Sequence, residues 1–310
     1  MTDKSVIVTG AAGSIGKLAV DHLARRGFAV HAVDKRPQSR VPPGVVAHVA
    51  DIKKRGFDDV LRKVRPRALL HLARERRFTV SAAERYRVNF EGTTRVFELA
   101  LAAGVKKIVF PSRHTVYGAL PDNPAFMLEE HPPTAGRTFP EIQDLVAADL
   151  FASAMLWRNP ETEVVVLRPV NVLGPTVNTL FSRYLSPKRV FTIAGYDPVH
   201  QVLHEDDLAV ALEYSLEPGL KGVFNVTGPG EVPLHVIVEE SGAQRVPLPE
   251  AVIKLVRGRL GFASIPQGAL DFLKFQCTVD GTRFSKATGF SARHNLRETI
   301  RSMRGRRVGP

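Results

Sequence analysis

Three glycines spaced three residues apart follow the first apolar segment of the chain. The apolar residues of Ser5–Thr9 predict a strand, and Gly10, Gly13 and Gly16 come directly after it. Residues 15–26 then carry apolar side chains at helical spacing. The first glycine permits a tight turn, the second lets the backbone approach a pyrophosphate, and the third lets the helix pack closely on the strand. The pattern predicts a Rossmann-type unit that binds a dinucleotide at the start of its first helix.

The second predicted strand ends in a carboxylate, Asp34. An acid about 20 residues after the glycines accepts hydrogen bonds from ribose hydroxyls and favours NAD over NADP. Lys35 and Arg36 follow directly and present the alternative, because their cations could hold the 2′-phosphate of NADP. Asp34 would repel that phosphate, so we predict NAD as the cofactor and NADP as the less favoured one. Further cofactor contacts are expected at Ser14, Ile15, Lys35, Asp51 and Ile52.

Apolar strand patterns continue to alternate with helical ones through the first half of the chain. The further predicted strands are 29–33, 45–49, 68–73, 107–111, 164–168 and 223–226, with a long helix at 82–103. This alternation predicts an α/β fold, a doubly wound parallel sheet with helices on both faces. We expect a Rossmann domain over 1–170, completed by 201–228. The looser segments 171–200 and 229–310 are expected to form a smaller, discontinuous C-terminal substrate lobe with a frayed basic tail.

Composition and charge indicate the environment and the partners to expect for the protein. Cys277 is the single cysteine, so no internal disulfide can form. No secretory start and no apolar run of roughly 18 residues is evident, and we expect a soluble, cytoplasmic protein. The net charge is +12, and residues 251–310 hold twelve Lys and Arg against three acidic residues. We interpret this as a solvated basic face. Peripheral membrane contact by an amphipathic helix within 251–275 stays an alternative, and without a recognisable motif we expect no specific nucleic acid.

Several further motifs resemble those of the extended short-chain dehydrogenase/reductases, the NAD-dependent epimerase/dehydratase family. The GxxGxxG spacing above is this family's form, and the resemblance runs nearly end to end. The other matching segments are the HLA element at 71–73, NxxGT at 89–93, SxxxVYG at 112–118, LRxxNxxGP at 167–175 and HVxDLA at 204–209. The resemblance implies an NAD cofactor, nucleotide sugars or other phosphate-bearing ligands as substrates, and a homodimer formed through the segments near 90–104 and after Pro140.

The resemblance also assigns residues to the two ligands. It implies cofactor contacts by Leu72, Ala73, Asn89 and Pro169, and substrate contacts by Asn171, His200 and Arg113. Asn171 matches an asparagine that contacts nucleotide-sugar phosphates in relatives, although a loop-fixing role fits equally well. Relatives have an arginine at the position of His200, so one phosphate anchor is weakened or lost.

The usual catalytic groups of the family are replaced. Its members use a YxxxK tyrosine and lysine with a helping Ser or Thr; the lysine lowers the pKa of the tyrosine. In register, these positions are occupied by Phe139, Gln143 and Arg113. No tyrosine lies between residues 117 and 184 and no lysine between residues 107 and 188, so the motif is not shifted nearby.

Two functions therefore stay open from the sequence. One is an epimerase/dehydratase-like oxidoreductase that obtains its proton by another route, for which His114 is a candidate because imidazole titrates near neutrality. The other is a non-catalytic NAD(H)-sensing or scaffolding protein that binds a partner protein or an anionic membrane surface. For Tyr117 we expect a structural role. We expect a hydrogen-bonding role for His114 as well, because most histidines in loops serve this purpose.

Overall fold

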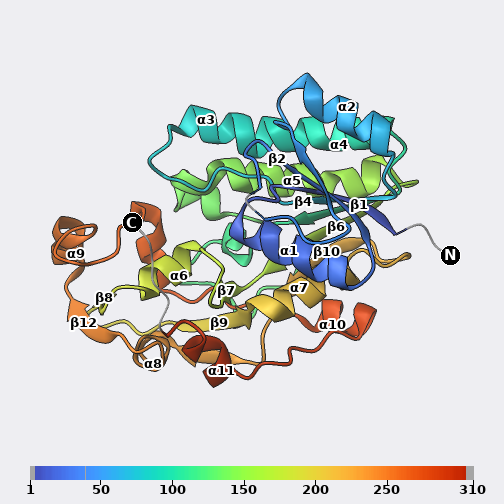
Figure 1. Ribbon diagram of the computed structural model, residues 1–310. Coiled ribbons are helices and arrows are strands. Elements are labelled where there is room, and N and C mark those ends of the chain that lie inside the picture. Colours follow the sequence, from blue (N-terminus) through green and yellow to red (C-terminus); the bar gives the residue numbers. More distant parts are fainter. Residues whose placement is uncertain (1–3, 39, 305–310) are drawn as a thin grey trace. The chain divides into compact units, whose positions relative to one another are not determined.

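The seven strands predicted from the sequence form one sheet. The computed structural model describes residues 4–38 and 40–304. The sheet order is β10, β6, β5, β4, β1, β2, β3 (Figure 1). The strands are β1 (Ser5–Thr9), β2 (Ala29–Asp34), β3 (Val46–Val49), β4 (Ala68–His71), β5 (Lys107–Pro111), β6 (Glu163–Pro169) and β10 (Gly222–Val226). This is the Rossmann-type arrangement that the alternating sequence pattern predicts.

The strand order reverses between β1 and β4. β1 pairs in parallel with β2 on one side, where Val6 lies opposite Val30, and with β4 on the other, where Val6 lies opposite Ala68. β4, β5 and β6 continue the parallel pairing. In open sheets of this kind, ligands bind beyond the carboxyl ends of the strands at such a reversal. The topology therefore places a binding region at the ends of β1 and β4.

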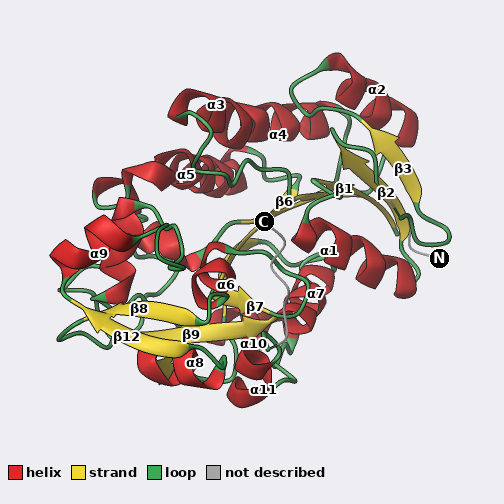
Figure 2. Ribbon diagram, turned by 60° about the vertical axis from the view of Figure 1, so that its left-hand side comes forward, coloured by secondary structure: helices red, strands yellow, loops and turns green. Residues whose placement is uncertain are grey.

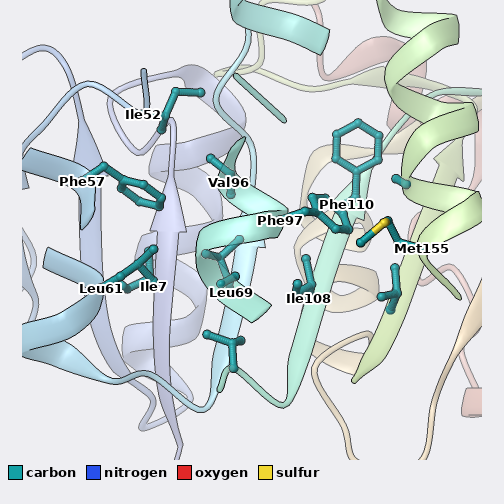
Figure 3. Packing of buried hydrophobic residues seen from close by; sticks show 14 of the residues in the cluster. Ile7, Ile52, Phe57, Leu61, Leu69, Val96, Phe97, Ile108, Phe110 and Met155 are labelled. Atoms are coloured by element: carbon teal, nitrogen blue, oxygen red, sulfur yellow. The ribbon is translucent and has the colours of Figure 1, made fainter. Parts of the chain in front are cut away.

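Several helices bury apolar residues in the core of this sheet. The helices are α1 (Ser14–Arg25), α2 (Arg55–Val64), α3 (Ala82–Tyr86), α4 (Gly92–Ala102), α5 (Gln143–Arg158) and α7 (Glu205–Tyr214). Figure 3 shows Phe57 of α2, Phe97 of α4 and Met155 of α5 packed with strand residues such as Ile7 and Ile108. On α1, the ring of His22 and the guanidinium of Arg26 just past its end reach Glu213 of α7. Burial of large side chains at roughly 1.5–3 kcal/mol each holds these layers together.

The long helix predicted over 82–103 is interrupted. Between α3 and α4 the residues Arg87–Glu91 form a π-helix, which contains Asn89. A π-helical turn adds a residue and shifts the apolar register, but five residues are too few for the sequence spacing to reveal it. π-helical turns are frequent at functional sites.

The remaining segments form a second unit. The first unit, called the sheet unit, comprises Met1–Ser112, Asp144–Arg168 and Ala209–Phe224; the second unit comprises Arg113–Gln143, Pro169–Leu208 and Asn225–Pro310. The sequence analysis placed the start of the second lobe at 171. In the structure, residues 113–143 group with the second unit, because their contacts are with late parts of the chain. Met127 bridges to Val279, and Asn123 donates to the carbonyl of Gln276.

The second unit contains two small sheets, both visible in Figure 2. One has β9 (Val199–His204) between β7 (Asn171–Leu173) and β11 (Glu231–Pro233), and the other pairs β8 (Arg189–Ile193) with β12 (Gln244–Leu248) in parallel. Its helices are α6 (Leu180–Leu185), α8 (Leu234–Glu240), α9 (Glu250–Val256), α10 (Thr282–Thr288) and α11 (Leu296–Arg301), with 3-10 turns at His114–Tyr117, Ala135–Arg137, Pro140–Ile142 and Gln267–Leu273.

The basic stretch 251–275 is not one amphipathic helix. α9 ends at Val256, and the next helical turn is the 3-10 helix Gln267–Leu273, called η5 here. Leu255 and Leu260 are exposed. Among the described residues, no helix combines the length and apolar character needed to span a bilayer. The predicted frayed tail falls largely on residues 305–310, outside the described residues.

Candidate functional site

The glycine turn between β1 and α1 leaves no room for side chains at two of its positions. Gly10 has a φ of +69°, and a Cβ there would lie 2.6 Å from the backbone nitrogen of Ala73. A Cβ on Gly16 would lie 2.1 Å from the carbonyl oxygen of Gly10. Gly13 is less confined, since its Cβ would meet the same oxygen at 3.2 Å. The first and third glycines thus form the turn and the helix contact, and Gly13 is the least enclosed of the three.

The start of α1 is suited to an anionic ligand. Gly13 is its N-cap; within the described chain no side chain caps the helix and no acidic residue stands in its first turn, which includes Ser14 and Ile15. The backbone N–H groups and the positive end of a helix dipole attract phosphate at such a terminus. The first turn of α1 itself carries no acidic residue, and the carboxylate that bonds the glycine turn is that of Asp34, at the end of β2.

Asp34 connects the end of β2 to the glycine turn. Its buried carboxylate accepts a hydrogen bond from the N–H of Ala12 at 3.0 Å and another from the N–H of Arg36 at 2.9 Å. The Arg36 guanidinium also lies against it, with Nε at 3.3 Å. The side chain of Arg36 is therefore paired with Asp34, while Lys35 is exposed. The carboxylate of Asp34 therefore lies beside the glycine turn. Of the two cations that follow it, Arg36 is held in an ion pair with this carboxylate.

A chain of hydrogen bonds fixes the turn after β4. The hydroxyl of Thr93 donates to the carbonyl of Asn89 at 2.6 Å, so it accepts from Nε2 of His71 at 3.1 Å. Nδ1 of His71 then accepts from the hydroxyl of Thr9 at 2.7 Å. The Thr9 oxygen in turn accepts the N–H groups of Leu72 and Ala73 at 3.2 and 3.3 Å.

This chain requires a neutral imidazole. Complete burial, and secondarily the cation of Arg74, lower the pKa of His71 to about 3. A neutral ring donates at one nitrogen and accepts at the other, which matches its two partners. His71 thereby holds Leu72 and Ala73 against Gly10. Because their backbone lies so close, residue 10 must be a glycine.

Asn89, in the π-helix, holds the loop that follows Ala73. Its Oδ1 accepts the N–H of Glu75 at 2.7 Å, and its Nδ2 donates to the Glu75 carbonyl at 2.9 Å and to the Asp144 carboxylate at 2.5 Å. These bonds tie the loop after β4 and the first turn of α5 to the π-helix. Asn89 thus acts on the geometry of the site through the backbone it positions.

Two further predicted contacts follow β3. Asp51 accepts the N–H of Lys53 at 2.9 Å through its carboxylate, which forms a local turn. Ile52 is buried in the core cluster and lies against Gly92, where a Cβ would meet its Cδ1 at 3.1 Å. In the sheet unit, Gly10, Asp34 and Leu72 thus lie at or directly after the carboxyl ends of strands, and Asn89 bonds to the loop that follows β4.

The other predicted site residues lie in the second unit. Phe139 is 2% exposed, and its ring lies 6.1 Å from that of Phe272 in η5. A Cβ on Gly268 would lie 2.5 Å from the Cα of Phe139. Gln143 is exposed at the start of α5, and Arg113 is extended just before a 3-10 turn. The position of Phe139 is thus a packed apolar one, covered by η5.

Two buried histidines of the second unit are neutral. Nδ1 of His114 bonds with the carbonyl of Pro169 at 3.1 Å, and burial lowers the pKa of His114 to about 3. Burial lowers the pKa of His200 to about 4, against the opposing effects of Asp197 and the Phe272 backbone. Nε2 of His200 has no hydrogen-bond partner among the described residues. Burial penalises the cation of His114 and leaves it unsuited to act as a base near neutral pH. Its bond with Pro169 agrees with the hydrogen-bonding role expected for it.

Asn171 and Tyr117 make contacts inside the second unit. Nδ2 of Asn171 donates weakly to the carbonyl of Gln201, at 3.4 Å. The Tyr117 hydroxyl donates to Oδ1 of Asn225 at 2.9 Å, a buried bond that agrees with the structural role expected for this tyrosine.

Residues 6–227 match the model of the NAD dependent epimerase/dehydratase family. The chain belongs to this family. The match covers most of the chain, although it leaves out the last segment of the second unit, from residue 228 on, and it confirms the family resemblance and the NAD-type cofactor predicted from the glycines and Asp34.

Relatives of this family member include proteins without an assigned activity. The uncharacterised protein Rv0501 of Mycobacterium tuberculosis is 29% identical over 323 residues, covering 99% of this chain and 85% of the relative. UDP-glucose 4-epimerase of Mus musculus is 31% identical over 190 residues, which covers 50% of this chain and 52% of the mouse protein.

Solved structures agree with the fold of this family member. MoeE5, in complex with UDP-glucuronic acid and NAD, superposes with a TM-score of 0.74 at 24% identity, covering 96% of this chain and 97% of MoeE5. UDP-glucose 4-epimerase of Thermus thermophilus, in complex with NAD, gives a TM-score of 0.73 with the same identity and coverage. The predicted α/β fold with a Rossmann-type sheet is thus confirmed.

Some residues that organise the site were not assigned by the sequence analysis. The hydroxyl of Thr9 and the ring of His71 fix the turn after β4, and Gly268 and Phe272 cover Phe139. A threonine ending an apolar strand is a weak signal for Thr9. Nothing local marks the residues of η5, because they follow Phe139 by more than 120 residues in the sequence.

Proposed function

We propose that this protein binds NAD(H) at the turn between β1 and α1 and carries out no epimerase chemistry of the tyrosine–lysine kind. The observation that carries the proposal is the buried Phe139. It stands where the family's tyrosine is expected, has no ionisable group, and packs against Phe272 and Gly268. Gln143, at the lysine position, brings no charge. The protein would then act by binding the dinucleotide, either to sense the redox state of NAD(H) or to serve as a scaffold for a partner protein.

The neighbouring groups of the second unit do not supply a substitute base. His114 and His200 are neutral at pH 7 and gain a proton only near pH 3 and 4. Burial raises the pKa of the Cys277 thiol to about 12. A general acid or base works best with a pKa near the operating pH. Loss of such a group costs about 10²–10⁴ in rate, so turnover by this site should be very slow.

The cofactor contacts support NAD(H) in particular. We place the pyrophosphate on the first turn of α1, beside Gly13, and the adenosine ribose at Asp34, with Lys35 at the rim. The adenine is placed at Asp51 and Ile52. The nicotinamide half is assigned to Leu72, Ala73 and Pro169 from the family pattern. Arg36 is paired with Asp34, so a 2′-phosphate would have to displace an existing ion pair.

The substrate assignment differs from that of the relatives. MoeE5 was solved in complex with UDP-glucuronic acid, and the family resemblance assigns substrate contacts in this chain to Asn171 and His200. His200 is buried and neutral, and so gives no cation to a diphosphate. Arg113 is the remaining candidate cation at this position. We therefore expect a nucleotide sugar to bind weakly if at all.

An enzyme of the epimerase class is the second candidate. The 31% identity with mouse UDP-glucose 4-epimerase over half of the chain favours it. In that case a phosphate-bearing sugar would bind through Asn171. The proton released from the sugar would be accepted by a residue that does not belong to the family's usual catalytic set.

Isothermal calorimetry and a turnover assay test the two candidates. The variants are Gly13→Ala, whose methyl group would face the pyrophosphate, and Gly56→Ala on α2, whose Cβ would meet nothing closer than 4.0 Å. We expect wild type and Gly56→Ala to bind NADH, Gly13→Ala to bind at least about tenfold more weakly, and none to turn over UDP-, GDP- or dTDP-sugars with NAD⁺. Specific turnover by wild type, lost in Gly13→Ala, would establish the enzyme instead. Absence of NADH binding by wild type would refute both.

The exposed apolar residues of α5 support a homodimer. Leu150 and Trp157 are exposed on this helix, and Trp157 is 87% exposed. We infer self-association through α4 and α5, as the family resemblance implied. Light scattering coupled to gel filtration should give twice the chain mass for wild type and a lower mass for Trp157→Lys; a monomeric wild type would refute the inference.

A further inference from the structure

Two histidines and an aspartate of the second unit converge away from the residues assigned above. His204 is the last residue of β9, Asp206 stands in the first turn of α7, and His294 lies in the segment before α11. The two imidazole rings stack with their centroids 3.8 Å apart. Oδ2 of Asp206 lies 3.5 Å from Nδ1 of His204 and 3.9 Å from Nε2 of His294.

These separations are close to those of a metal coordination shell. Zinc binds nitrogen and oxygen at about 2.0–2.2 Å, so two ligand atoms in a tetrahedron lie roughly 3.4 Å apart. One potential ligand atom from each of the three residues lies within 4.8 Å of the other two. The two rings lie nearly parallel, so side-chain rotations that unstack them would bring the three ligand atoms to bonding distance.

A buried carboxylate orients one of the rings. Oδ2 of Asp207 lies 3.2 Å from Nδ1 of His294, and the Asp207 carboxylate also accepts the backbone N–H groups of Arg293 and His294. Asp207 is 1% exposed. With its Nδ1 proton directed to Asp207, His294 keeps the lone pair of Nε2 on the side of Asp206. Metal-binding histidines commonly carry such a carboxylate partner, which fixes the ring and its tautomer.

The charge balance also favours a cation. Glu205, Asp206 and Asp207 occupy the first turn of α7. Glu205 is held by the backbone of Thr176 and Val177 and lies apart from the three ligands. Nδ1 of His204 accepts the N–H of Asp206 over a long 3.2 Å, a bond that an ion would replace.

We propose that His204, Asp206 and His294 bind a divalent transition-metal ion of the zinc type, with water completing the shell. Two imidazoles and one carboxylate suit Zn²⁺ and its neighbours better than Mg²⁺ or Ca²⁺, which prefer oxygen ligands alone. The ion would join the segment before α11 to the end of β9 and the start of α7. Its role would be to fasten the C-terminal part of the second unit.

Metal titration of the untagged, full-length protein tests the proposal. After treatment with EDTA and dialysis, Co²⁺ is added while its visible absorption is recorded, and Zn²⁺ is then used to displace it. We expect one equivalent to bind with a micromolar or lower Kd, and Zn²⁺ to raise the melting temperature. His294→Gln and Asp206→Asn should each weaken binding at least tenfold and remove the thermal shift.

A matched histidine provides the control. His235 is also paired with an aspartate, Asp197, in the second unit, but at a different place. His235→Gln should bind Co²⁺ as wild type does. Circular dichroism without metal checks folding; if His294→Gln is unfolded, the exposed Asp206→Asn carries the test. Absence of saturable binding by wild type, or equal affinity in Asp206→Asn and His235→Gln, would overturn the site. NADH binding is measured in parallel and should not change, so this result is separate from the proposed function.

Discussion

The hydroxyl of Thr9 is predicted to hold the cofactor turn together. Thr9→Val keeps the shape of the side chain but removes the oxygen that bonds with Nδ1 of His71 and accepts the N–H of Ala73. The N–H of Leu72 keeps a bond to the Thr9 carbonyl at 3.2 Å. Two polar groups thus lose their partner in the protein, and each such loss costs about 1–3 kcal/mol when the group is buried. We expect the free energy of unfolding to fall by about 2–4 kcal/mol.

Urea denaturation followed by circular dichroism gives this free energy, and NADH titration gives the effect on the site. Thr9→Ser is the control, because it keeps the oxygen and loses a single buried methyl group, worth about 1 kcal/mol. NADH affinity should fall in Thr9→Val and change little in Thr9→Ser, since Ala73 then keeps its place against Gly10. Equal destabilisation of the two variants would refute the hydrogen-bond chain as the element that fixes this turn.

Three other predictions follow from buried or paired charges. Folding lowers the pKa of His71 and of His114 from 6.5 to about 3, and the pKa of His200 from 6.5 to about 4. The unfolded chain therefore binds more protons below pH 6.5, and stability should fall from there to pH 4 by up to about 1.4 kcal/mol per pH unit for each histidine; a urea midpoint unchanged between pH 7 and 5 would contradict this. Asp34 predicts tighter binding of NADH than of NADPH, and Asp34→Asn should narrow the difference; calorimetry showing NADPH as the tighter ligand of wild type would reverse the assignment. Asp149→Asn leaves the buried guanidinium of Arg168 without its anionic partner and should cost about 3–5 kcal/mol of stability, measured by urea unfolding, whereas a loss under 1 kcal/mol would mean that other groups satisfy Arg168.

The sheet and the glycine turn could be predicted because their signals are local. A strand followed by closely spaced glycines and an amphipathic helix leaves few alternatives, and Asp34 lies on the next strand. β1 and β5 have the predicted bounds, and the other predicted strands differ at their ends by one or two residues. The parallel topology follows from the alternation of strands and helices.

Features that depend on contacts between distant residues could not be predicted. His294 and His204 are ninety positions apart in the chain, and no spacing rule relates them. The same holds for Phe139 and Gly268. His114 illustrates a different limit: the sequence gives the residue type, but its pKa depends on burial that only the folded structure defines.

The contact of Gly268 with Phe139 makes these two positions interdependent. Any side chain at residue 268 would collide with the main chain at residue 139, so a larger residue there would push η5 away. An engineer who wished to install an acid–base pair by substituting Phe139 and Gln143 would therefore have to redesign η5 in the same step. Random mutagenesis should accordingly recover few substitutions at residue 268, even though it carries no side chain of its own.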